Sequence, residues 1–163
     1  MAKSKYRLQV LLDIREKERD KKQDELRIVR EKLRNEQQEL ERRRKEHQKM
    51  KDRRVEKEQE LFEKMRSGQF GVNGYLDGER FLKRLDKEIE DYLPVIKEQE
   101  KVVIFAEQEV EWAFEELLKA EQELKALEKH KEKKMAEIKA EMLAKEEAAA
   151  EEVATTIFLF KDR

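Results

Sequence analysis

The chain has no cysteine among its 163 residues, one proline and four glycines. The absence of cysteine excludes disulfides, iron–sulfur clusters and thiol nucleophiles. No segment approaches the roughly 18 consecutive apolar residues that a membrane-spanning helix requires. The first 21 residues also lack the continuous apolar stretch and the small-residue cleavage site of a secretory signal. Together these features predict a soluble protein inside the cell.

Apolar residues are scarce as well. Charged residues make up 48% of the chain and apolar residues 37%, so a thick globular core is excluded. Such a composition is typical of a long helix or coiled coil, in which a narrow apolar seam needs few large side chains. Intrinsic disorder is the alternative for this composition. The heptad pattern described below argues against disorder, except in the last 20 residues.

All four glycines, Gly68, Gly71, Gly74 and Gly78, fall within one short window in the middle of the chain. Because glycine is unfavourable inside a helix, this placement indicates two long helices around one turn. Pro94 predicts a kink or restart in the second helix. The expected organisation is a single unit, with helix 1 at about 4–66, the turn at 67–78, helix 2 at about 79–150 and a flexible or partner-bound tail at 151–163.

Heptad spacing is strong in the second arm and weaker in the first. In the second arm large residues alternate with a mostly small set. The large set is Leu82, Ile89, Ile96, Val103, Val110, Leu117 and Leu124, and the other is Leu85, Tyr92, Gln99, Ala106, Ala113, Ala120 and Leu127. The first-arm seam, with Leu12, Leu26, Leu33, Leu40 and Leu61, is interrupted by charged residues. We therefore predict an all-α fold, an antiparallel coiled-coil hairpin in the form of a rod.

The two arms carry opposite charge. Residues 1–66 hold 23 Lys/Arg against 16 Asp/Glu, and residues 67–163 hold 16 against 24. Opposite charges favour antiparallel closure of one chain on itself, although solvated faces that differ by chance are the alternative. A turn near residue 73 would place Leu61 opposite Leu85 and Leu40 opposite Ala106. The chain beyond about residue 143 would then have no first-arm partner.

No pattern of catalytic or metal-binding residues is present. The two histidines, His47 and His130, lie in charged helical surroundings, and neither HExxH, a phosphate loop nor a nucleophile elbow occurs. We expect no enzyme activity, no cofactor and no metal. A basic cluster at residues 42–54 is diluted by interleaved acids; it is either a solvated face, a site for an acidic protein or a nucleic-acid site. Nucleic-acid binding is the least favoured of the three.

The second arm also has more apolar residues than a two-stranded seam can bury. Phe105 and Trp112 are seven residues apart, on one face outside the seam. Exposed aromatic residues of this kind are typical of a partner surface. The alternative is a third helix packed there, for which the C-terminal tail is the candidate.

Three segments resemble the flagellar export protein FliJ and its type III secretion counterparts of the YscO type. Residues 6–16 read YRLQVLLDIRE, similar to the family's N-terminal pattern of an aromatic, a Leu pair and D-x-[RK]-E. Met65–Gly68 followed by Gly78–Leu85 is similar to the family's turn and second-helix start. The acidic, alanine-rich segment from Lys145 to Val153 is similar to the family's C-terminal stretch.

This resemblance implies a non-enzymatic central stalk similar in shape to the γ stalk of rotary ATPases. Such a stalk inserts into a hexameric export ATPase and contacts the cytoplasmic domain of the membrane export gate; some members also handle export chaperones. The location implied is cytoplasmic, at the inner face of the cell membrane. Carried over to this sequence, the gate-contacting strip is Phe81, Leu85, Glu88 and Tyr92, and the ATPase-contacting strip is Tyr6, Leu8, Leu11 and Leu12.

Two alternatives stay open at this stage. Leu85 and Tyr92 also occupy heptad core positions, so packing within the seam competes with a partner role for both. The chain as a whole is expected to be monomeric, but a homodimeric coiled-coil scaffold or tether without an export role would share its composition and periodicity.

Overall fold

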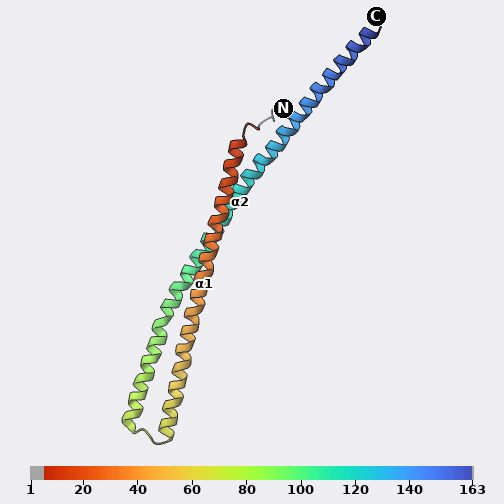
Figure 1. Cartoon of the computed structure of the whole chain (residues 1–163). Coiled ribbons are helices and arrows are strands. Elements are labelled where there is room, and N and C mark those ends of the chain that lie inside the picture. The colour runs from red at the N-terminus through yellow and green to blue at the C-terminus, as the bar shows by residue number, and fades with distance from the viewer. Residues whose placement is uncertain (1–5, 163) are drawn as a thin grey trace. The chain divides into compact units, whose positions relative to one another are not determined.

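The computed structural model describes residues 6–162 and contains two long helices joined by a short turn (Figure 1). Helix α1 spans Gln9–Arg66 and helix α2 spans Val72–Lys161. The two helices pack against each other in opposite directions, which confirms the predicted all-α antiparallel coiled-coil hairpin. Neither helix has a stretch within the described residues that is long and apolar enough to cross a membrane.

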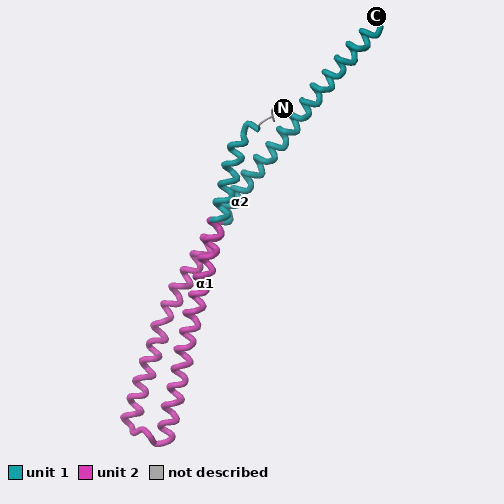
Figure 2. The backbone as a smooth tube through the Cα atoms, in the orientation of Figure 1, with its two compact units in different colours: residues 1–24, 114–163 teal, residues 25–113 magenta. Residues whose placement is uncertain are grey.

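The hairpin divides into two compact units (Figure 2). The turn unit, residues 25–113, holds the turn and the helical segments on either side of it. The terminal unit comprises residues 1–24 and 114–163 and holds both chain ends. Each unit contains a segment of α1 packed against a segment of α2.

In the turn unit the core is a single seam. Leu40 of α1 packs with Ile96 and Val103 of α2, and Leu33 and Tyr92 lie against them. Every α2 position predicted for the seam is buried or half-buried. The heptad pattern of the second arm is therefore confirmed as the packing face of α2.

Polar side chains within this seam form hydrogen bonds with the other helix. His47 is only 7% exposed, and its Nε2 donates to the backbone carbonyl of Ile89 at 3.2 Å. Gln99, 4% exposed, donates to the carboxylate of Glu36 at 2.6 Å and to the Glu36 backbone carbonyl at 3.0 Å. Because a buried polar group left unpaired is costly, these bonds favour one alignment of the helices over others.

The turn is shorter than predicted. We expected it at 67–78 and helix 2 from about residue 79, but α2 begins at Val72 and includes two of the four glycines. Gly74 and Gly78 lie inside α2, and other side chains occupy the space beside them. A Cβ at Gly74 would lie 2.6 Å from Phe70 Cδ1, and one at Gly78 would clash with Leu61 Cδ1. These two glycines allow close packing rather than a change of chain direction.

The alignment of the helices changes accordingly. Leu61 faces Gly78 instead of the predicted Leu85, a difference of one heptad. Leu40 lies with Ile96 and Val103 instead of opposite Ala106. A displacement of seven residues keeps each seam facing the other helix. The prediction of which residues form the seams is therefore confirmed, and the prediction of which residues lie opposite each other is wrong. The cause is the earlier start of α2.

Gly68 is the glycine that the turn requires. Its φ of 73° is left-handed. The amide of Gly68 donates to the Met65 carbonyl at 3.2 Å and the amide of Gln69 to the Lys64 carbonyl at 3.1 Å. This pair of bonds is the Schellman arrangement that closes many helix C-termini.

We expect Gly68→Ala to lower the free energy of unfolding by about 1 kcal/mol, because a Cβ disfavours left-handed backbone. Asparagine adopts that conformation more readily, so Gly68→Asn should lose less. Urea unfolding followed by circular dichroism measures both. Equal stability of Gly68→Ala and the wild type would contradict a required left-handed residue here.

Pro94 does not interrupt α2. The helix runs without a break from Val72 to Lys161 with Pro94 inside it. The predicted restart of the helix at Pro94 is therefore wrong, and the kink stays a prediction. Pro94 is exposed, so its ring lies on the solvent side of the helix, where a missing amide donor is better tolerated because water can bond the freed carbonyl.

In the terminal unit the first residues of α1 pair with the middle of α2. Arg15 forms an ion pair with Glu123 at 2.8 Å, and Lys131 donates to Gln9 at 2.8 Å. The hydroxyl of Tyr6 hydrogen-bonds Nδ1 of His130. Helix 1 was expected from about residue 4, but α1 begins at Gln9, and residues 4–5 lie outside the described part.

The C-terminal part of α2 continues beyond these contacts. Side chains from residue 139 to residue 162 are all exposed, and the helix persists to Lys161. The unpaired segment therefore starts earlier than residue 143, as the one-heptad change of alignment requires. The expected tail at 151–163 is helical as far as Lys161, which corrects the expectation of a flexible segment, and the partner-bound alternative stays a prediction. Because α2 is continuous, its end does not fold back as a third helix.

Candidate partner-binding surfaces

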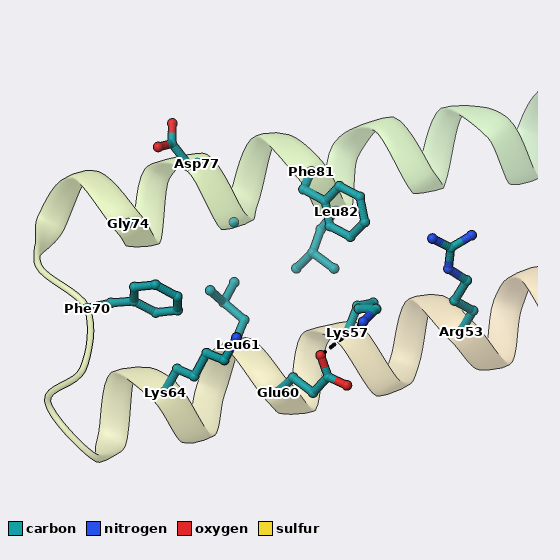
Figure 3. A pocket seen from close by; sticks show the side chains of 11 residues that line it. Arg53, Lys57, Glu60, Leu61, Lys64, Phe70, Gly74, Asp77, Phe81 and Leu82 are labelled. Carbon is teal, nitrogen blue, oxygen red and sulfur yellow. Dashed lines mark hydrogen bonds and ion pairs between the residues drawn. The ribbon is translucent and has the colours of Figure 1, made fainter.

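An open groove lies beside the turn, between α1 and α2. Its volume is about 460 Å³. Figure 3 shows Phe70, Leu61 and Leu82 pointing into the space between the two helices. The groove is lined by Arg53, Lys57, Glu60, Leu61, Lys64, Phe70, Gly74, Asp77, Gly78, Phe81 and Leu82. We call it the tip groove.

Local sequence explains this groove. The missing side chains at Gly74 and Gly78 leave room for Phe70 and Leu61. Lys64 lies over the Phe70 ring, 5.4 Å from its centroid, a cation–π arrangement. The tip groove therefore combines an apolar floor with charged side chains of both signs at its edge.

The predicted gate strip divides into exposed and buried residues. Phe81 is half-buried in the wall of the tip groove, and the Arg84 guanidinium lies 5.7 Å from the centroid of its ring. Glu88 is exposed, whereas Leu85 is only 6% exposed and packs in the seam. Phe81 and Glu88 are thus accessible to a partner, and Leu85 is a core residue.

Tyr92, the fourth residue of the strip, is tied to α1. Its ring stacks on His47 with centroids 6.0 Å apart, and its hydroxyl donates to Glu46 at 3.1 Å. Burial, followed by the hydrogen bond to the Glu46 carboxylate, raises the pKa of Tyr92. A tyrosine is neutral at physiological pH even without this increase, so the phenol is a hydrogen-bond donor there. Its position supports the competing interpretation that Tyr92 serves the seam.

The predicted ATPase strip divides in the same way. Tyr6 and Leu12 are 8% and 4% exposed and belong to the terminal-unit core. Leu8 and Leu11 are 39% and 37% exposed. A partner of this segment could reach Leu8 and Leu11 directly and would affect the other two through the packing.

Phe105 and Trp112 are both exposed on α2, at 52% and 50%. Their rings meet edge to face with centroids 6.4 Å apart. The structure brings these two predicted residues together, and it places them away from the seam. The third-helix alternative loses its candidate, because the C-terminal tail is part of α2 itself as far as Lys161.

The basic cluster at residues 42–54 is largely neutralised. Five of its eight cations form ion pairs, namely Arg42, Arg43, Arg44, Lys45 and Arg54. Hydrogen bonds from Arg42 and Arg43 lower the pKa of Glu39 to about 2. These acids reduce the positive field that a nucleic-acid site needs.

The tip groove was only partly predictable. Phe81 was identified from the sequence, but Leu61 had been assigned to the seam alone and Phe70 had no assigned role. The signal for Phe70 was its place between Gly68 and Gly71.

No group of three or more His, Cys, Asp or Glu side chains that could hold a metal occurs within residues 6–162.

Comparisons with known proteins identify a family to which the sequence matches and a solved structure with a similar fold. The model of a family described as YscO-like protein matches residues 3–163. The solved structure of a YscO homologue from Chlamydia trachomatis is similar, with a TM-score of 0.82 and 24% sequence identity over 98% of each chain. At that identity the likeness concerns the fold alone. No curated protein matches the chain.

Proposed function

The chain belongs to the YscO-like protein family, and we propose that it acts in type III protein secretion as a non-enzymatic stalk. In this role it inserts into a hexameric export ATPase and links the ATPase to the export gate. Its location is then cytoplasmic, at the inner face of the cell membrane. Binding of export chaperones is part of the same proposal.

One observation carries the proposal. The family match extends over residues 3–163, and along this length the chain is an antiparallel helical hairpin. The turn belongs to one compact unit of the hairpin and both chain ends belong to the other. That division suits a protein that links two partners.

The accessible residues of each region are assigned to one partner. In the turn unit, Phe81 and Glu88 contact the cytoplasmic domain of the gate, with Phe81 as the anchor in the wall of the tip groove. In the terminal unit, Leu8 and Leu11 contact the ATPase. Leu85, Tyr92, Tyr6 and Leu12 support these contacts by fixing the helices beneath them.

Co-purification with a hexameric export ATPase tests the proposal. We expect a stable complex and faster ATP hydrolysis when the full-length chain is added. The double variant Leu8→Ser/Leu11→Ser should abolish the stimulation while the helical circular dichroism signal is retained, because both side chains are exposed. A matched control is Ile28→Ser, which changes an exposed apolar residue of α1 in the other unit.

Two outcomes would count against the stalk. One is the absence of both complex and stimulation with the wild-type chain. The other is a homodimer that persists at low micromolar concentration in light scattering, which would favour a coiled-coil scaffold or tether instead. A monomer that stimulates ATP hydrolysis agrees with the stalk and not with the homodimeric scaffold or tether.

A further inference from the structure

An exposed strip on α2 has no role in the hairpin. It consists of Ile104, Phe105, Gln108 and Trp112, and we call it the outer strip. Ile104, Phe105 and Trp112 are 63%, 52% and 50% exposed. By helical geometry these positions share the side of α2 opposite the seam residues Val103 and Ala106. The outer strip shares no residue with the tip groove.

The two rings of the outer strip are held in place relative to each other. Seven residues separate Phe105 and Trp112, so their Cα atoms lie about 10.5 Å apart along the helix. Their ring centroids are nevertheless only 6.4 Å apart, at an interplanar angle of 86°. The side chains lean towards each other in the edge-to-face geometry that aromatic pairs prefer. A partner would therefore meet an aromatic ridge that is already formed.

Acidic residues border the outer strip. From Val102 to Ala113 the chain has three glutamates and neither lysine nor arginine, and Lys101, one turn before Phe105, forms an ion pair with Glu98 at 3.3 Å. Glu107 and Glu111 are exposed along one edge of the strip, and neither forms an ion pair within residues 6–162. Glu109 borders the other edge and pairs with Lys32 of α1 at 3.0 Å. An apolar surface with acidic edges is complementary to one with basic edges.

We propose that the outer strip binds a basic amphipathic helix of a partner protein. Apolar residues at i, i+3 or i+4 and i+7 of that helix would pack on Phe105 and Trp112, as the apolar faces of two helices do in a coiled coil. Its lysine or arginine side chains would pair with Glu107 and Glu111, as edge charges do in coiled coils. The same glutamates would repel an anionic lipid surface. The proposal does not depend on the stalk role.

Trp112 is the single tryptophan of the chain, so its fluorescence reports directly on the outer strip. The probe is a synthetic heptad peptide with leucine at the a and d positions and lysine at e and g. A second peptide has glutamate in place of lysine. We expect the lysine peptide to shift Trp112 emission saturably to shorter wavelengths, and the glutamate peptide to leave it unchanged.

Variants separate the apolar and the charged parts of the site. Phe105→Ala should weaken binding of the lysine peptide at least about tenfold, whereas the control Ile28→Ala should leave it unchanged. Glu107→Lys/Glu111→Lys should reverse the preference in favour of the glutamate peptide. Circular dichroism confirms that each variant remains helical.

Three results would overturn the proposal. Equal binding of both peptides would remove the charge complementarity. Unchanged binding by Phe105→Ala would remove the aromatic ridge from the site. A concentration-dependent emission shift of the wild-type chain without peptide would identify a second copy of this chain as the occupant.

Discussion

Leu40→Ala should lower the free energy of unfolding by about 2–3 kcal/mol, close to the lower end of the range for buried leucines. Leu40 is 8% exposed and packs on Ile96 and Val103. A two-helix seam has no second layer of side chains that can move in and fill the space. The seam is also open to water on both sides, so water partly fills the cavity that the truncated side chain leaves. The loss of stability therefore stays below the largest values measured for buried leucines.

The expected loss corresponds to a decrease in Tm of roughly 5–10 °C for a chain of this size. Thermal and urea unfolding followed by circular dichroism at 222 nm measure it. The matched control is Ile28→Ala, on the same helix and in the same unit but 57% exposed, which should change stability by less than about 0.5 kcal/mol. Equal losses in the two variants would contradict the assignment of Leu40 to the core.

The helices and their seams were predictable because both rest on local periodicity. Alternating spacings of three and four place Leu82 to Leu127 on one face whatever the partner. The same periodicity leaves the alignment between helices undetermined, because a displacement of seven residues again brings seam to seam. The choice among such alignments depends on the length of the turn and on polar pairs such as Gln99 with Glu36.

The error in the turn came from treating all glycines alike. Gly68 has the left-handed backbone that makes glycine a turn signal. Gly74 and Gly78 lie inside α2, where the absence of a Cβ admits Phe70 and Leu61. A single sequence does not distinguish a glycine needed for conformation from one needed for space, because that difference depends on residues brought close by the fold.

The candidate surfaces were predictable to the extent that they lie on one helix. Phe105 and Trp112 were found from their spacing along α2, since residues seven apart share a face. The tip groove needed side chains from α1, the turn and α2 together, and its residues become neighbours only at the observed alignment. Similarly, the buried state of Tyr6 depends on His130, which is 124 residues away in the chain.

Under the proposed stalk function, Phe81→Ala should weaken binding to the cytoplasmic domain of the export gate about thirtyfold, which corresponds to the roughly 2 kcal/mol of an interface hot spot. Phe81 is half-buried in the wall of the tip groove, where its ring is accessible beside Arg84. Its removal leaves the seam intact, so Tm should fall by less than about 3 °C. Titration calorimetry with the purified gate domain measures the affinity.

Leu85→Ala is the matched comparison, four residues further along α2. Leu85 is 6% exposed in the seam, so its truncation should cost about 2–3 kcal/mol of stability. Its effect on gate binding at a temperature where the variant remains folded should be several-fold smaller than that of Phe81→Ala. The two variants thus separate contact with the gate from support of the helix. If Phe81→Ala instead lowers Tm as much as Leu85→Ala while binding is retained, Phe81 belongs to the core and the gate contact lies elsewhere.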